Sequence, residues 1–176
     1  MLLVARDNRS GASHIHYLPE GGTVRTMGIP VERNGNAVYV HLGNQSLRIE
    51  SPGQVNLTHV VLTLMPLERL FETPDPVRTI HDLEMLTFDE NLSTNARKLV
   101  RLYAALLGLK HFDRAPDTVK EGLILTVARL IRLTPEEIVT NRAEVEQLLT
   151  RELEETLGRV TSEELETVLS ATGVLG

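Results

Sequence analysis

The sequence contains no cysteine and no tryptophan, and it has only three tyrosines and three phenylalanines. Without cysteine the chain can form neither a disulfide nor a thiolate metal site, and it has no thiol nucleophile. So few aromatic rings also argue against a surface that stacks bases or an aromatic cage for a cation. The core must therefore be built mainly from leucine, valine and isoleucine.

Long hydrophobic runs are missing as well. A helix that spans a bilayer needs about 18 or more predominantly apolar residues, and no segment approaches this. Charged residues follow directly after residues 1–5, so the basic and apolar regions of a signal peptide are not seen. We therefore expect a soluble, cytoplasmic protein that does not bind membranes.

The glycine-rich and nucleophile motifs of common enzyme classes are also absent. The chain has no Walker loop, no dinucleotide-binding glycine pattern and no nucleophile elbow. We expect no cofactor, and the sequence favours a protein that is not an enzyme.

The first third of the chain alternates short apolar segments with turn residues. Asn34-Gly35 separates two of these segments and favours the positive φ angles of a type I′ hairpin turn. Closely spaced strands with short loops predict an antiparallel β-barrel or sandwich over about residues 1–65. The expected strands are 2–5, 14–18, 23–27, 31–33, 37–42, 47–50 and 59–64.

Helical signals dominate the rest of the chain. Residues 66–92 carry three prolines and suit a connector with short helices, and residues 93–176 form the predicted helical domain. Gly108 is the expected stop of its first helix, and Thr161 with Glu164 forms a capping box for its last. The expected helices begin at Ser93, at Asp117 or Thr118, at Thr134 and at Thr161. The predicted fold class is α+β, with the β-barrel or sandwich followed by a bundle of about four to five helices.

Charge is distributed unevenly along this helical part. Residues 93–133 hold eight Lys or Arg against three acids, whereas residues 134–176 hold ten Glu against three Arg. A basic helical middle can bind phosphates or an acidic protein surface. The candidate residues for a nucleic acid or protein partner are Arg97, Lys98, Arg101, Arg129 and Arg132.

Part of this basic region resembles a helix-turn-helix. The resemblance covers residues 127–138, with Arg132 at the turn position where glycine is usual. The second helix would start with Glu136 and Glu137, which phosphates repel. Base reading by that helix is therefore not expected.

The third expected helix is long and acidic with a narrow apolar stripe. Such a stripe suits a coiled-coil seam with a second copy, or packing within one chain. The candidate residues of an oligomer interface are Ile138, Val145, Leu149, Leu153 and Leu157.

Two histidines share one face of an expected strand and provide a metal-site candidate. His14 and His16, with Glu20 four residues further on, form a pattern that resembles the H-x-H-x-x-x-E core of the cupin superfamily. The resemblance implies a small β-barrel that holds a divalent metal on these residues, with His59 as a further ligand.

Three functions remain open at this stage. The favoured hypothesis is a non-enzymatic protein-interaction or assembly module that acts in a homo-oligomer or a larger complex. The first alternative is a regulator associated with nucleic acid through the basic helices, and the second is a small metal-dependent, cupin-like protein.

Overall fold

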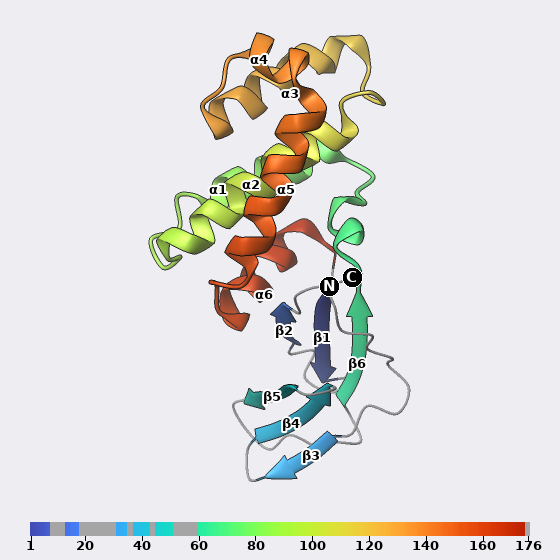
Figure 1. Ribbon diagram of the computed structural model, residues 1–176, viewed down its shortest axis with the longest axis vertical. Helices are drawn as coiled ribbons and strands as arrows, with labels where there is room; N and C mark the ends of the chain where they lie inside the picture. Colours follow the sequence, from blue (N-terminus) through green and yellow to red (C-terminus); the bar gives the residue numbers. More distant parts are fainter. Residues whose placement is uncertain (8–12, 18–30, 35–36, 43–44, 51–59, 175–176) are drawn as a thin grey trace. The chain divides into compact units, whose positions relative to one another are not determined.

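Figure 1 shows the computed structural model of the chain. The structure describes residues 1–7, 13–17, 31–34, 37–42, 45–50 and 60–174. The chain divides into two compact units, Met1–Leu67 and Glu68–Gly176.

The first unit contains a three-stranded antiparallel sheet with its first strand in the middle. Strand β1 (Leu2–Asp7) pairs with β2 (Ser13–Tyr17) on one side and with β6 (Val60–Met65) on the other. Leu3 lies opposite His16 in β2 and opposite Leu64 in β6. Leu2, Leu3, Ile15 and Met65 are buried, as their apolar side chains favour.

A second three-stranded antiparallel sheet consists of β3 (Val31–Asn34), β4 (Ala37–Leu42) and β5 (Gln45–Glu50). The predicted hairpin is confirmed by the pairing of β3 with β4, but the predicted turn position is wrong, because Asn34 is a strand residue that pairs with Ala37 and has no positive φ. The two residues between Asn34 and Ala37 lie outside the described residues. The strand expected at 23–27 also lies outside them.

The predicted barrel or sandwich is not supported. Among the described residues, no strand of one sheet pairs with a strand of the other. Local alternation predicts strands well, but closure of a barrel depends on pairing between strands that are distant in sequence. The described β structure is therefore two small antiparallel sheets.

The second unit is helical and accounts for most of the regular structure. Its elements, within the described part of the chain, follow the short 3₁₀-helix η2 (Leu67–Phe71) and are α1 (Pro76–Leu86), α2 (Thr94–His111), α3 (Asp117–Ile131), α4 (Pro135–Thr140), α5 (Arg142–Leu157) and α6 (Ser162–Thr172). None of the helices described is both long and apolar enough to cross a membrane.

Helix α2 is the centre of this bundle. It contacts α1, α3, α5 and α6, and Figure 1 shows it running among them. Residues 102–109 are all buried, so this stretch of α2 is apolar around its whole circumference, as a central helix requires. The remaining helices each bury one face against α2 or its neighbours.

The helix starts follow the capping signals in the sequence. The side-chain oxygens of Asp75, Ser93, Thr134 and Thr161 each accept a hydrogen bond from a backbone N–H in the first turn. At Thr161 the reciprocal bond from its backbone N–H to the Glu164 carboxylate is also present, so the predicted capping box is confirmed.

Glu164 also links the start of α6 to the start of α2. Its second carboxylate oxygen accepts hydrogen bonds from the Ser93 backbone N–H at 3.0 Å and from the Ser93 hydroxyl at 2.6 Å. Burial opposes ionisation of this carboxyl, but the hydrogen bonds from Ser93 and Thr161 outweigh it and lower the pKa of Glu164.

Two predicted helix boundaries are wrong. Helix α2 does not stop at Gly108 but continues to His111, because Gly108 faces α3 in the middle of a helix crossing. A Cβ atom at Gly108 would lie 2.6 Å from Val127 Cγ2. The expected long third helix is broken at Asn141, whose φ of −116° and ψ of 31° separate α4 from α5.

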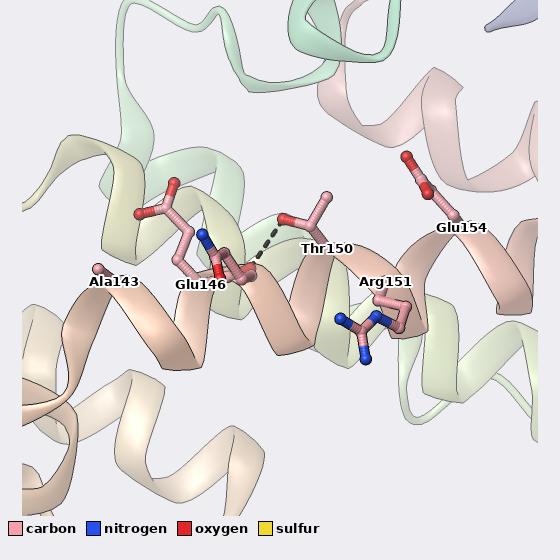
Figure 2. A pocket seen from close by; sticks show the side chains of 6 residues that line it. Ala143, Glu146, Thr150, Arg151 and Glu154 are labelled. Carbon is pink, nitrogen blue, oxygen red and sulfur yellow. Dashed lines mark hydrogen bonds between the residues drawn. The ribbon is translucent and has the colours of Figure 1, made fainter. Parts of the chain in front are cut away.

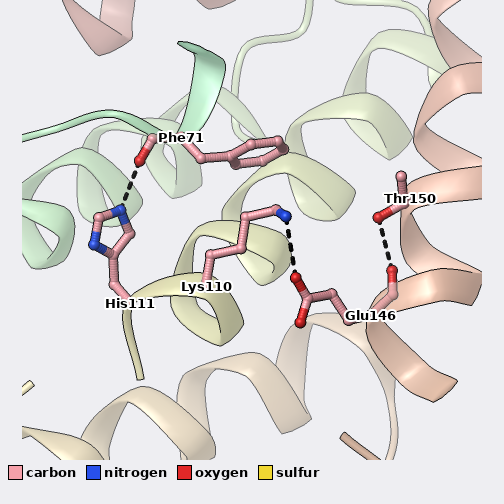
Figure 3. Close-up of polar contacts among 5 residues, drawn as sticks. All are labelled: Phe71, Lys110, His111, Glu146 and Thr150. Carbon is pink, nitrogen blue, oxygen red and sulfur yellow. Dashed lines mark hydrogen bonds and ion pairs between the residues drawn. The ribbon is translucent and has the colours of Figure 1, made fainter. Parts of the chain in front are cut away.

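Polar contacts fix the segment that precedes α1 against α2. The Tyr103 hydroxyl donates to the backbone carbonyl of Leu70 at 2.5 Å, and His111 Nε2 lies 2.6 Å from the carbonyl of Phe71. Figure 3 shows Lys110 beneath the Phe71 ring, 4.9 Å from its centroid, with its ammonium 3.0 Å from Glu146 of α5. Burial raises the pKa of Tyr103 far above its ordinary value, despite a hydrogen bond with Thr172 that lowers it.

Candidate functional site

The strongest candidate site is a groove of about 660 Å³ within the helical unit, which we call the basic groove. It lies between the C-terminal ends of α1 and α3, the first half of α2 and the middle of α5. Four of the five basic residues that the charge pattern singled out line it. They are Lys98, Arg101, Arg129 and Arg132.

Two helices bring these four cations to one groove. Lys98 and Arg101 are three residues apart on α2, so they lie on one face of that helix. Arg129 lies in the last turn of α3, which packs on α2, and Arg132 is the C-cap residue of α3. Two pairs of cations from separate parts of the sequence therefore face one groove.

Arg132 holds an unusual backbone conformation at this position. Its φ of 58° and ψ of 39° lie in the left-handed region, where among the described residues no other non-glycine residue is found. The backbone N–H of Leu133 closes the end of α3 by donating to the carbonyl of Ala128 at 3.2 Å. Glycine is the usual residue at such a helix end, because a Cβ atom makes this conformation costly. An arginine here therefore carries a backbone strain that glycine would not.

Apolar side chains complete the groove. Leu102 and Leu149 are buried at its floor, whereas Phe88 is 77% exposed and Leu148 is 52% exposed. Large apolar side chains that stay exposed around a hollow are typical of a surface that binds a partner. The groove thus combines cations with an uncovered apolar surface.

The cations of the groove are only partly neutralised. Glu84 and Glu152 also line it, and Arg129 Nη2 lies 2.7 Å from the Glu84 carboxylate. Lys98, Arg101 and Arg132 form no ion pair with any residue in the described part of the chain. The groove therefore has an excess of positive charge on a chain whose net charge is −6.

The fifth predicted cation, Arg97, is not part of the groove. Its Nη2 donates to the backbone carbonyl of Asp89 at 3.2 Å, in the turn between α1 and α2. Arg97 thus helps to hold this turn.

The predicted oligomer seam is filled from within the chain. Val145, Leu149, Leu153 and Leu157 of α5 are at most 9% exposed, and Ile138 of α4 is fully buried. Helix α5 packs on α2, so these side chains belong to the core of the bundle. Packing within one chain, the alternative that the sequence left open, accounts for the stripe.

Two of the four predicted metal ligands lie among the residues that the structure describes. His14 and His16 both lie on β2 with one residue between them, and Glu20 and His59 lie outside the described residues. Within the described ranges no group of three or more His, Asp or Glu side chains is arranged to hold a metal ion.

A second hollow of about 520 Å³ lies along α5 alone. Figure 2 shows Glu146, Thr150, Arg151 and Glu154 along it. The hydroxyl of Thr150 donates to its own helix at the Glu146 carbonyl, at 2.8 Å. In the described part of the chain, all the residues that line this hollow belong to one helix, and polar groups on the surface of a single helix make a poor binding site.

Sequence reasoning missed the apolar part of the basic groove. Phe88 follows the last turn of α1, in a stretch that looked like part of a connector, and Leu148 sits beside the narrow stripe of α5. The sequence signal that could have revealed it is a large apolar residue outside the apolar stripe of a helix.

Comparisons with profiles of known families, with curated proteins and with solved structures find no match to this chain.

Proposed function

We propose that this protein is a non-enzymatic interaction module whose basic groove docks an acidic, amphipathic segment of a partner protein. The observation that carries the proposal is that one groove combines exposed Phe88 and Leu148 with three cations that form no ion pair within the described part of the chain. A segment with glutamates or aspartates beside apolar residues complements both features.

The lining of the groove favours binding over catalysis. Of the residues described there, none is a histidine, serine, cysteine or tyrosine, and the carboxylates belong to Glu84 and Glu152. The Glu84 carboxylate is already paired with Arg129, at 2.7 Å. These groups suit recognition of charge more than the transfer of a proton or an acyl group.

A nucleic acid is the alternative occupant, since the four cations could contact phosphates. The exposed apolar side chains of Phe88 and Leu148 gain nothing from a sugar–phosphate backbone, whereas they can bury the apolar residues of a protein segment. The groove lining therefore favours a protein partner.

The proposal is tested by fluorescence anisotropy with two labelled probes and the full chain. One probe is a helical peptide of leucine, glutamate and alanine, and the other is an oligothymidylate of equal net charge. We expect the peptide to bind more tightly than the oligonucleotide, with an affinity that falls as salt is raised because exposed charges are screened. Tighter binding of the oligonucleotide, or no peptide binding at low salt, would contradict the proposal.

A triple variant, Lys98→Gln, Arg101→Gln and Arg132→Gly, tests whether the groove is the binding site. Each partly exposed ion pair contributes about 0.5 kcal/mol, so losing three weakens peptide binding about tenfold. The matched control removes three exposed arginines outside the groove, by changing Arg114, Arg151 and Arg159 to glutamine. Equal losses in both triple variants would show that overall charge, and not the groove, attracts the peptide.

The same variants address self-association. A wild-type dimer that depends on concentration and that the groove variant dissociates, seen by light scattering, would replace the external partner by a second copy of the chain. A monomer at all concentrations leaves the groove to an external partner.

A further inference from the structure

A third depression adjoins the basic groove and has a different chemistry. It has a volume of about 340 Å³ and lies between α1 and α3, which both pack on α2. We call it the α1–α3 hollow. Val77 and Ile80 of α1 and Val119 and Leu123 of α3 supply its apolar lining. It is large enough for one leucine, methionine or phenylalanine side chain.

Glu84 and Arg129 line both the hollow and the basic groove. Their ion pair, at 2.7 Å, joins α1 to α3 where the two depressions meet. Along α1 the lining residues recur at Val77, His81, Glu84 and Phe88, which is the spacing of one helical face. From Val77 to Phe88 this face extends about 16 Å, or about three helical turns.

Gly122 gives independent evidence that the hollow is kept open. It lies in the middle of α3, where glycine costs about 1 kcal/mol relative to alanine. A Cβ atom at Gly122 would meet nothing within 4 Å, so no close packing requires glycine there. Gly108 differs, because its Cβ would collide with Val127. The missing side chain at Gly122 instead deepens the hollow that it lines.

We infer that one partner segment occupies both depressions, with a large apolar side chain anchored in the α1–α3 hollow and its acidic residues beside the cations of the basic groove. This inference rests on the proposed function and adds the shape of the partner, an amphipathic helix of about three turns with an apolar end and an acidic end. A buried apolar anchor surrounded by charged contacts is a common source of affinity in such interfaces.

Gly122→Leu provides the test, because Gly122 lines the hollow and has open space around the position of a Cβ atom, so that a larger side chain attached there occupies the hollow from α3. The probe is a labelled helical peptide of about 12 residues, with leucines in its first half and glutamates in its second. We expect the variant to bind this peptide at least tenfold more weakly, and to lose the difference between it and a peptide with alanines in place of the leucines. The matched control is Glu121→Leu, which adds the same side chain to an exposed position of α3 that does not line the hollow.

The outcomes separate this inference from the proposed function. If the peptide binds the wild type and the basic-groove variant binds it weakly, but Gly122→Leu binds it as the wild type does, the anchor is wrong and the docking function stands. If Glu121→Leu weakens binding as much as Gly122→Leu, the effect is not specific to the hollow and the inference also fails. If the wild type does not bind the peptide at low salt, both proposals are wrong. Circular dichroism of each variant verifies that the helices are intact.

Discussion

Replacing Arg132 by glycine should stabilise the protein, although it removes a long side chain from the surface. The left-handed conformation at Arg132 costs a residue with a Cβ atom about 1–2 kcal/mol, and glycine avoids this cost. Glycine also increases the conformational entropy of the unfolded chain, which offsets about 0.4–1 kcal/mol of the gain. The expected net stabilisation is about 0.5–1 kcal/mol, or a rise in melting temperature of about 1–4 °C.

Thermal unfolding followed by circular dichroism at the helical band measures this effect. Arg132→Ala is the matched control, because it removes the same charge but keeps a Cβ atom in the left-handed conformation. We expect the alanine variant to be no more stable than the wild type. Equal stabilisation by glycine and alanine would refute the argument from strain, and would assign the gain to relief of repulsion from the neighbouring cations Lys98 and Arg101.

Three further predictions concern the bundle itself. Gly108→Ala should destabilise the protein by about 1–3 kcal/mol in urea unfolding, because its Cβ atom would overlap Val127. Gly122→Ala should instead stabilise the protein by up to about 1 kcal/mol, because its Cβ atom meets nothing and alanine favours a helix. Equal effects of the two substitutions would contradict the helix crossing at Gly108. Because the pKa of Glu164 is lowered on folding, its ionisation stabilises the protein above the ordinary value of 4.5, and this contribution is lost as pH falls through the lower folded pKa. Glu164→Gln should therefore be less stable than the wild type at pH 7, and the difference should shrink towards pH 3; a constant difference would contradict this. Tyr103→Phe should cost about 1–2 kcal/mol in the same assay, because it leaves a buried backbone carbonyl without its donor; no loss would show that this carbonyl finds another donor.

The sequence predicted the helical signals and most strand segments because these depend on neighbouring residues. Caps at Ser93, Thr134 and Thr161 involve atoms within about four residues, so the chain pattern is enough to identify them. The hairpin of β3 and β4 was predicted for the same reason, although Asn34 belongs to the strand and not to the turn. The sequence could not show whether Gly108 ends a helix or lies at a close helix crossing. Only the proximity of Val127 in α3 shows that it lies at a crossing.

The sequence also identified the cations of the candidate site, but it could not tell which of them meet. Five of the eight basic residues in 93–133 were selected as candidates. The packing of α3 on α2 brings four of these five to one groove, whereas Arg97 donates to a backbone carbonyl outside it. The apolar stripe of α5 likewise fitted two partners, and only the position of α2 decides that the stripe is internal. Capping hydrogen bonds and hydrophobic periodicity depend on residues that are close in sequence, so the sequence alone determines them. A groove, a helix–helix seam or a hollow depends on contacts between helices that are far apart in sequence, and only the packing of the core determines those contacts.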